Sequence, residues 1–317
     1  MAKYRETLPQ LSNELFLTDG GIETTLIFHE GRDLPYFAAF DLLKHAAGQA
    51  ALRKYFRTYA EIAQKYSVGF ILESATWRAS ADWGAKLGYS TDALAAANRQ
   101  AIALLDEIRD DFESERTPMV ISGCIGPRGD GYSPANFMNE TEAQDYHRLQ
   151  AQAFRDADAD MVTAITMTYP EEAIGIVRAG QGAGMPVAIA FTVETDGKLP
   201  NGQALGDAIA QVDGATDNAP LYYMINCAHP SHFADLLYNG GAWRSRIHGI
   251  RANASIKSHK ELDEATSLDA GDPIDLAKRY RELKASLSQL NVFGGCCGTD
   301  HRHIDAICQA VLSERPT

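Results

Sequence analysis

The chain has 317 residues, of which 45% are hydrophobic and 22% are charged, and its formal net charge is −13. This composition indicates a globular protein with a substantial core, and the negative charge disfavours binding to nucleic acid or to anionic membranes. There is no run of about 18 apolar residues and no apolar secretion signal after the first methionine, so we expect a cytoplasmic protein. The five cysteines include two neighbours, which suits a reducing compartment better than a disulfide framework.

Short apolar runs alternate with longer segments of helical periodicity along the chain, which predicts parallel strands joined by helices. We expect strands at residues 15–18, 69–73, 119–122, 161–166, 187–192, 221–226, 247–252 and 291–294, and helices that include 49–66, 91–112, 141–157 and 273–290. Eight strands favour an α/β fold of one closed (β/α)8 TIM barrel, and no linker divides residues 1–317 into further domains. A doubly wound open sheet is the alternative.

Residues that carry chemistry follow the predicted strands. Asp19 and Gly20 follow the first strand, Glu73 ends the second with Trp77 and Arg78 beyond it, Cys227 follows the sixth, and Cys296 and Cys297 follow the eighth. Active sites of such barrels lie at the C-terminal ends of the strands. We therefore expect these residues to face one mouth of the barrel, where we assign Arg78 the role of anchoring its own loop.

Cys227, Cys296 and Cys297 are the candidate metal ligands. Adjacent cysteines do not readily bridge each other, whereas two thiolates at one strand end can share a metal with a third from across a narrow barrel. Three thiolates leave one tetrahedral position of Zn²⁺ open, which is typical of catalytic zinc sites. A free cysteine is more commonly a small core residue, which is the role we assign to Cys308 and favour for Cys124.

At these motifs the sequence resembles the zinc-dependent homocysteine S-methyltransferase family. The resemblance rests on Thr18-Asp19-Gly20-Gly21, on Asn226-Cys227 and, most specifically, on Gly294-Gly295-Cys296-Cys297-Gly298-Thr299. It implies that the three cysteines bind Zn²⁺ and that the backbone of Asp19 and Gly20 holds the amino-acid part of a thiol substrate. The implied reaction moves a methyl group from a small onium donor, S-methylmethionine-like or betaine-like, to a thiol such as homocysteine, as in methionine biosynthesis.

The sequence departs from the family after the fourth strand. The family carries a glutamate there that binds the amino group of the substrate, and Ile165 falls at this position. An isoleucine cannot pair with an ammonium, and an unpaired cation in a closed site is costly. Either Glu73, Glu194 or Glu23 replaces the glutamate from a neighbouring strand, or the acceptor is a thiol without the amino-acid head group.

An onium donor also explains aromatic residues in the loops that follow the predicted strands. Ring faces attract cations, and six residues could supply them: Tyr36, Phe37, Trp77, Trp83, Tyr132 and Tyr169. The barrel accounts for nearly the whole chain, so we expect a small free donor and no folate or cobalamin module. In the family that the chain resembles, the betaine-using members carry a dimerisation extension after the last helix, so the resemblance favours an S-methylmethionine-like sulfonium donor here. The oligomeric state stays open.

Two other classes of protein remain as alternatives. A zinc-dependent hydrolase would activate water at the open position, although such sites usually draw on histidine and carboxylate ligands. His229, His248 and His301 lie near strand ends but show no ligand spacing with the cysteines. The other alternative is a protein that binds zinc or a thiol without catalysis.

Overall fold

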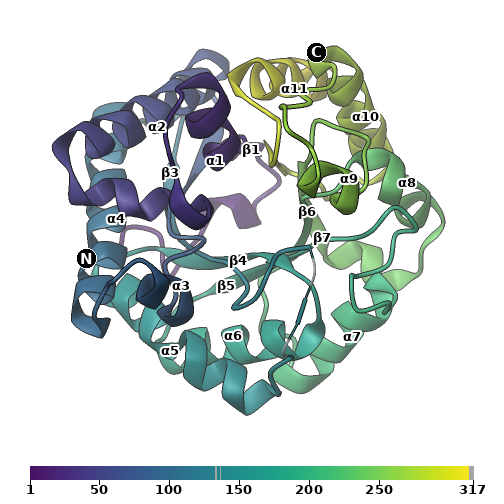
Figure 1. The fold of residues 1–317 in the computed structure, drawn as a ribbon. Coiled ribbons are helices and arrows are strands. Elements are labelled where there is room, and N and C mark those ends of the chain that lie inside the picture. Colours follow the sequence, from purple (N-terminus) through teal and green to yellow (C-terminus); the bar gives the residue numbers. More distant parts are fainter. Residues whose placement is uncertain (133, 136, 314–317) are drawn as a thin grey trace.

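Eight parallel strands close into one barrel in the computed structural model, which describes all residues except 133, 136 and 314–317 (Figure 1). The strands follow one another around the ring as β1 (Phe16–Leu17), β2 (Gly69–Glu73), β3 (Met119–Ile125), β4 (Met161–Met167), β5 (Val187–Phe191), β6 (Tyr223–Asn226), β7 (Ile247–Ala252) and β8 (Val292–Gly295). Strand β8 pairs with β1, with Val292 opposite Phe16, so the sheet has no free edge. This closure excludes the open-sheet alternative and confirms the predicted (β/α)8 barrel.

Long helices surround the strands on the outside of the barrel, and shorter helices lie at one end of it (Figure 1). They are α1 (Ile22–Thr24), α2 (Ala46–Tyr66), α3 (Ala81–Lys86), α4 (Thr91–Phe112), α5 (Glu140–Asp156), α6 (Pro170–Gly182), α7 (Leu205–Thr216), α8 (Pro230–Asn239), α9 (His259–Asp263), α10 (Pro273–Ser286) and α11 (His301–Leu312). Single-turn and irregular helices add Pro9–Leu11, Thr25–His29, Pro35–Phe37, Ala39–Lys44 and Ala242–Arg246. In the described chain no helix has the length and apolar character needed to cross a membrane.

Element boundaries differ from the predicted ones where backbone pairing decides them. Strand β3 runs on to Ile125 because Gly123 and Cys124 keep pairing with β4. Helix α5 starts at Glu140, where Asn139 and Glu142 form a capping box. Helix α10 ends at Ser286 rather than at 290, since Leu287 leaves the helical backbone region.

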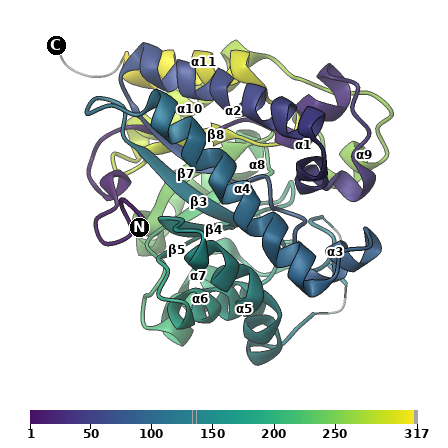
Figure 2. The same cartoon turned by 90° about the vertical axis from the view of Figure 1, so that its left-hand side faces the viewer.

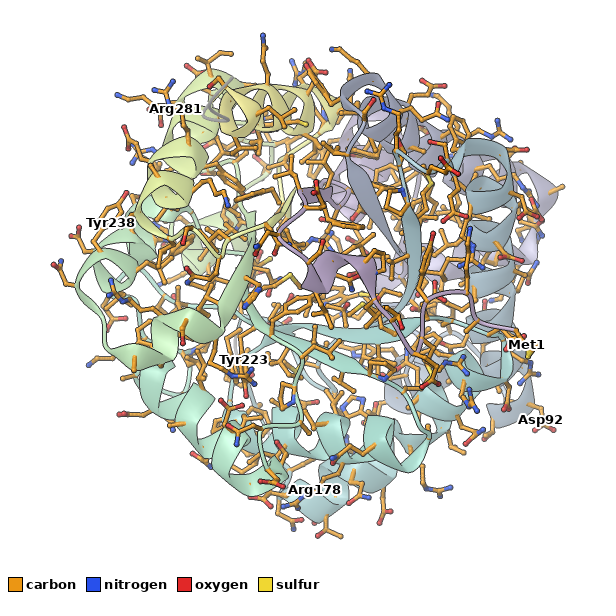
Figure 3. All side chains as sticks on the ribbon, turned by 180° about the vertical axis from the view of Figure 1, so that it is seen from behind. Met1, Asp92, Arg178, Tyr223, Tyr238 and Arg281 are labelled. Carbon is orange, nitrogen blue, oxygen red and sulfur yellow. The ribbon has the colours of Figure 1, made fainter. Side chains whose placement is uncertain are left out.

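The core has two parts, one between strands and helices and one inside the ring of strands. The inner part includes Phe16, Val120, Met224 and Val292, and Leu8 from the N-terminal segment packs against it. Figure 2 shows this segment at the end of the barrel opposite α1, α3 and α9. Viewed from behind, side chains fill the ring (Figure 3). One end of the barrel is therefore closed, and the C-terminal ends of the strands are left for a site.

The loop that carries Cys296 and Cys297 leads directly into α11, and Asp300 lies at the start of this helix. Asp300 caps the helix: it accepts a hydrogen bond from the Arg302 amide at 2.9 Å and lies 3.1 Å from His303 Nδ1. Although burial disfavours the charge of Asp300, bonds from His303 and Arg302 hold its pKa below the ordinary value. The cap is therefore charged throughout the neutral range.

We expect Asp300→Ala to lower the free energy of unfolding by about 1–2 kcal/mol at neutral pH, measured by urea denaturation, because it removes a helix cap. A carboxylate whose pKa is lowered by folding stabilises the folded state at pH values above its unfolded-state pKa. The stability difference between the wild type and Asp300→Ala should therefore shrink as the pH falls below about 4. Asp305→Ala on the same helix removes an exposed pair with Lys65 and should change stability by less than about 0.5 kcal/mol. Equal losses in both variants would contradict the assignment.

Candidate metal centre and active site

Three thiols meet at the C-terminal mouth of the barrel. The Sγ atoms of Cys227, Cys296 and Cys297 all lie within 4.8 Å of one another. Cys227 Sγ lies 2.9 Å from Cys296 Sγ and 3.7 Å from Cys297 Sγ. Tetrahedral ligands at a Zn–S distance of about 2.3 Å lie about 3.8 Å apart, so the Cys227–Cys297 pair is spaced as Zn²⁺ requires, whereas Cys227 and Cys296 would have to move apart to bind it. The predicted ligand set is brought together from β6 and β8.

The thiols of the cluster differ in pKa. Hydrogen bonds from Cys227 and Cys296 hold the pKa of Cys297 well below its ordinary value. The same contacts, with burial, raise the pKa of Cys227. A cluster of this kind holds negative charge at one sulfur and releases protons when a cation binds, which is the behaviour expected of a thiolate metal site.

The backbone of Cys227 is held in a strained conformation. Its φ is +57°, in the left-handed region that favours glycine. The Cys227 carbonyl accepts a hydrogen bond from Asn253 Nδ2 at 2.9 Å and lies 2.7 Å from His259 Nε2. These two side chains, from the loop after β7 and from α9, fix the turn that aims the thiol, because left-handed backbone persists only where its surroundings over-determine it.

The two glycine motifs at opposite ends of the chain pack against each other. A Cβ on Gly21 would lie 2.5 Å from the carbonyl oxygen of Cys296, and one on Gly20 would lie 2.9 Å from that of Thr299. Gly295 N donates to the Asp19 carbonyl at 2.9 Å. These glycines allow the loops after β1 and β8 to touch, which brings Asp19 beside the thiols.

Tyr132, in the loop after β3, covers the thiols. Its hydroxyl lies 3.4 Å from Cys227 Sγ and 3.3 Å from Cys297 Sγ, and its ring stacks on His259 with 4.1 Å between centroids. His259 Nδ1 in turn lies 3.0 Å from the Glu194 carboxylate. Glu194, a candidate amine partner in the sequence, therefore contacts the histidine that supports Cys227 and Tyr132.

A cavity of about 150 Å³ adjoins the thiols and is lined by all four predicted substrate-binding residues, Asp19, Gly20, Glu73 and Trp77. Asp19 is buried and its carboxylate bonds Arg251 at 2.6 Å and the Tyr55 hydroxyl at 2.9 Å. Glu73 lies 4.0 Å from the same guanidinium, and burial raises its pKa to about 7. Arg251, which sequence reasoning did not single out, is thus the counter-charge of the cavity floor.

The predicted aromatic mouth is only partly available to a donor. Phe37, Trp77 and Tyr132 line the cavity, whereas Tyr36 and Trp83 face Lys86. Tyr169 lies buried, with its hydroxyl accepting a hydrogen bond from the Met138 amide. The chain's own cations use several ring faces: the Arg78 guanidinium lies 3.9 Å from the Trp77 ring centre and 4.0 Å from that of Trp83.

The remaining candidates lie outside the thiol cluster, although Arg78 and Cys124 line the same cavity. Arg78, predicted to anchor its own loop, packs on Trp77 of that loop. It also connects to the loop after β3, where its Nη1 donates to the Gly129 carbonyl at 2.8 Å. His229 caps α8, and burial lowers its pKa to about 4. Cys308 is buried in α11, as expected of a core residue, whereas Cys124 is buried in β3 and also lines the cavity.

Comparison with known proteins bears on the whole barrel. A model of the homocysteine S-methyltransferase family matches residues 16–311. Homocysteine S-methyltransferase 3 of Arabidopsis thaliana is 22% identical over 225 residues, which cover 65% of this chain and 60% of the plant protein. The chain thus spans about 60% of the length of this relative.

Solved structures agree with the fold. The metallated form of the homocysteine methyltransferase MmuM from Escherichia coli superposes with a TM-score of 0.74 at 18% identity, covering 93% of this chain and 96% of that one. Its oxidized form gives a TM-score of 0.76 at 18% identity, covering 95% and 97%. The family match over residues 16–311 shows that this chain belongs to the homocysteine S-methyltransferase family.

Proposed function

We propose that this protein moves a methyl group from a small onium donor to a thiol at a Zn²⁺ site formed by Cys227, Cys296 and Cys297. The observation that carries the proposal is the convergence of these three thiols within 4.8 Å beside a cavity at the barrel mouth. Bound Zn²⁺ would supply the acidity that keeps a substrate thiol deprotonated at neutral pH. With homocysteine as the acceptor, the product would be methionine.

The residues around the thiols orient the reactants and exclude water. Asn253 and His259 hold Cys227, and Tyr132 covers the cluster from the loop after β3. The substrate sulfur attacks the methyl carbon in line, and the electron pair of the breaking bond leaves with the donor, which becomes neutral. Because the reaction consumes an anion and a cation, a desolvated and pre-arranged site supplies most of the acceleration.

Several features of the cavity support a cationic donor. Its wall includes the rings of Phe37, Trp77 and Tyr132, and its acidic residues include Asp130 and Asp263. Ring faces and carboxylates both attract onium groups. We propose a small sulfonium or quaternary ammonium as the donor class. Asp19, Gly20, Glu73 and Trp77 stay the predicted substrate contacts because all four line this cavity.

The function is tested with zinc-loaded protein, homocysteine and either S-methylmethionine or betaine, with methionine measured by mass spectrometry. We expect methionine to form with at least one donor, at a rate that falls when a chelator removes the metal. Hydrolysis of ester and amide substrates serves as the competing assay. Full zinc occupancy with hydrolysis, or with no methylation of any thiol, would refute the proposal.

We expect one Zn²⁺ per chain under reducing conditions, and a sharp loss of zinc affinity in Cys227→Ala, Cys296→Ala and Cys297→Ala, because each removes a ligand. Zinc content by mass spectrometry and competition with a chromophoric chelator measure both quantities. Cys308→Ala, a buried thiol outside the cluster, is the matched control and should bind zinc normally. Retention of full affinity in a Cys296→Ala, Cys297→Ala double variant would overturn the ligand assignment.

The support of Cys227 can be tested separately. Asn253→Ala removes a hydrogen bond to the Cys227 carbonyl, and we expect it to lower zinc affinity about tenfold, within the range typical of outer-sphere partners. The chelator competition assay reads this directly. His229→Ala changes a helix cap in the neighbouring α8 and should leave zinc affinity unchanged. A similar loss in both variants would indicate general destabilisation rather than positioning of the ligand.

A further inference from the structure

Glu23 and Arg78 bring a carboxyl group and a guanidinium to the cavity that adjoins the thiols. Both side chains line it, Glu23 from α1 and Arg78 from the loop after β2. Burial raises the pKa of Glu23 and lowers the pKa of Arg78, and the charge of each residue opposes this larger effect on the other. A dipolar group in this cavity would therefore meet a carboxylate and a guanidinium beside the reacting sulfur.

The Glu23 carboxylate is available to a ligand. The described residues give it no salt bridge and no side-chain hydrogen bond, and apart from its own backbone amide the groups around it act at longer range. It keeps accessible surface deep in the protein because that surface faces the cavity. Burial raises the pKa of Glu23 to about 8, and a cationic partner in the cavity would favour its charged form, so this position suits a ligand ammonium.

The Arg78 guanidinium has one edge without hydrogen bonds. Its side chain is 6% exposed and is held between the rings of Trp77 and Trp83. Nη1 donates to the Gly129 carbonyl, whereas Nε has no hydrogen-bond partner among the residues that the structure describes, and Nη2 lies 3.9 Å from the Asp130 carboxylate, beyond hydrogen-bond range. Nε and Nη2 form the fork that binds a carboxylate with two parallel bonds.

The acidic residues at the cavity floor are already engaged. Asp19 and Glu73 face Arg251, and the family's amine-binding position is occupied by the apolar Ile165, which also lines the cavity. A ligand ammonium would therefore find its counter-charge at Glu23 rather than at the floor or at the end of β4.

We propose that Glu23 and Arg78 form the head-group site for an α-amino-acid thiol, in which Glu23 binds the ammonium and Arg78 binds the carboxylate. The proposal rests on the proposed function, because it names the acceptor class of the same site. It replaces the alternative of a thiol without an amino-acid head group.

Three acceptors that differ only in the head group test this pairing: homocysteine, 4-mercaptobutanoate without the amine, and 3-aminopropanethiol without the carboxylate. We expect Glu23→Gln to lower kcat/KM about ten- to a hundredfold for the two amines and to spare 4-mercaptobutanoate. Arg78→Gln should lower it similarly for the two carboxylates and spare 3-aminopropanethiol. The surface variants Glu107→Gln and Arg53→Gln remove one acid and one base of an exposed ion pair and should change none of the ratios.

A crossed pattern cannot come from loss of structure, because misfolding lowers the rate with all three acceptors. Equal losses with every acceptor, or unchanged ratios in both variants, would overturn the proposal. An independent readout uses metal-free protein and calorimetric binding of methionine, 4-(methylthio)butanoate and 3-(methylthio)propylamine. We expect wild-type protein to bind methionine more tightly than either analogue. Glu23→Gln should lose the preference over 4-(methylthio)butanoate, and Arg78→Gln the preference over 3-(methylthio)propylamine.

The binding assay separates the two proposals. If no thiol is methylated but methionine binding depends on Glu23 and Arg78, the proposed function fails and the head-group site stands. If methylation proceeds and methionine binds no better than its analogues, the proposed function stands and the head-group site is wrong.

Discussion

Closure of β8 onto β1 is the constraint on which the whole site depends. It places Val292 beside Phe16 and lets the loops after the first and last strands touch. That contact needs glycine at position 21, since a Cβ there would lie 2.5 Å from the carbonyl oxygen of Cys296. The same closure puts two cysteines from the end of the chain opposite Cys227 and next to the cavity. Barrel geometry, rather than local sequence, thus assembles the thiols.

Cys227 shows how the rest of the molecule supports its part of the cluster. Left-handed backbone at a non-glycine residue costs of order 1–3 kcal/mol, and it persists only where other contacts over-determine it. Here Asn253 and His259 hold the carbonyl of the strained residue, and Tyr132 stacks on His259 while its hydroxyl faces the sulfurs. One histidine therefore couples the ligand turn to the loop that covers it. Loops after three different strands, β3, β6 and β7, must fold together before the site has its shape.

Much of this could be predicted from the sequence, for identifiable physical reasons. Strands buried on both faces leave apolar runs, and cysteines placed after two of them, at Cys227 and Cys296, must meet if the ring closes. Pairings between loops leave no such pattern. Glu194 follows a strand as a ligand-binding residue would, yet it contacts His259; Arg251 looks like an ordinary strand residue, yet it balances the cavity floor. Such contacts depend on loop conformations, which leave no periodic pattern in the sequence.

The charges around the cavity suggest how one barrel can serve different acceptors. The thiol cluster is fixed by closure and cannot move, whereas a head-group contact can be supplied by any strand end around the rim. In this chain the end of β4 contributes the apolar Ile165, while a carboxylate appears at Glu23 after β1 and a guanidinium at Arg78 after β2. Because Arg251 already neutralises the floor, a displaced carboxylate at the rim keeps its attraction for a ligand cation. Substrate choice can thus change around the rim while the sulfur chemistry at the centre stays the same.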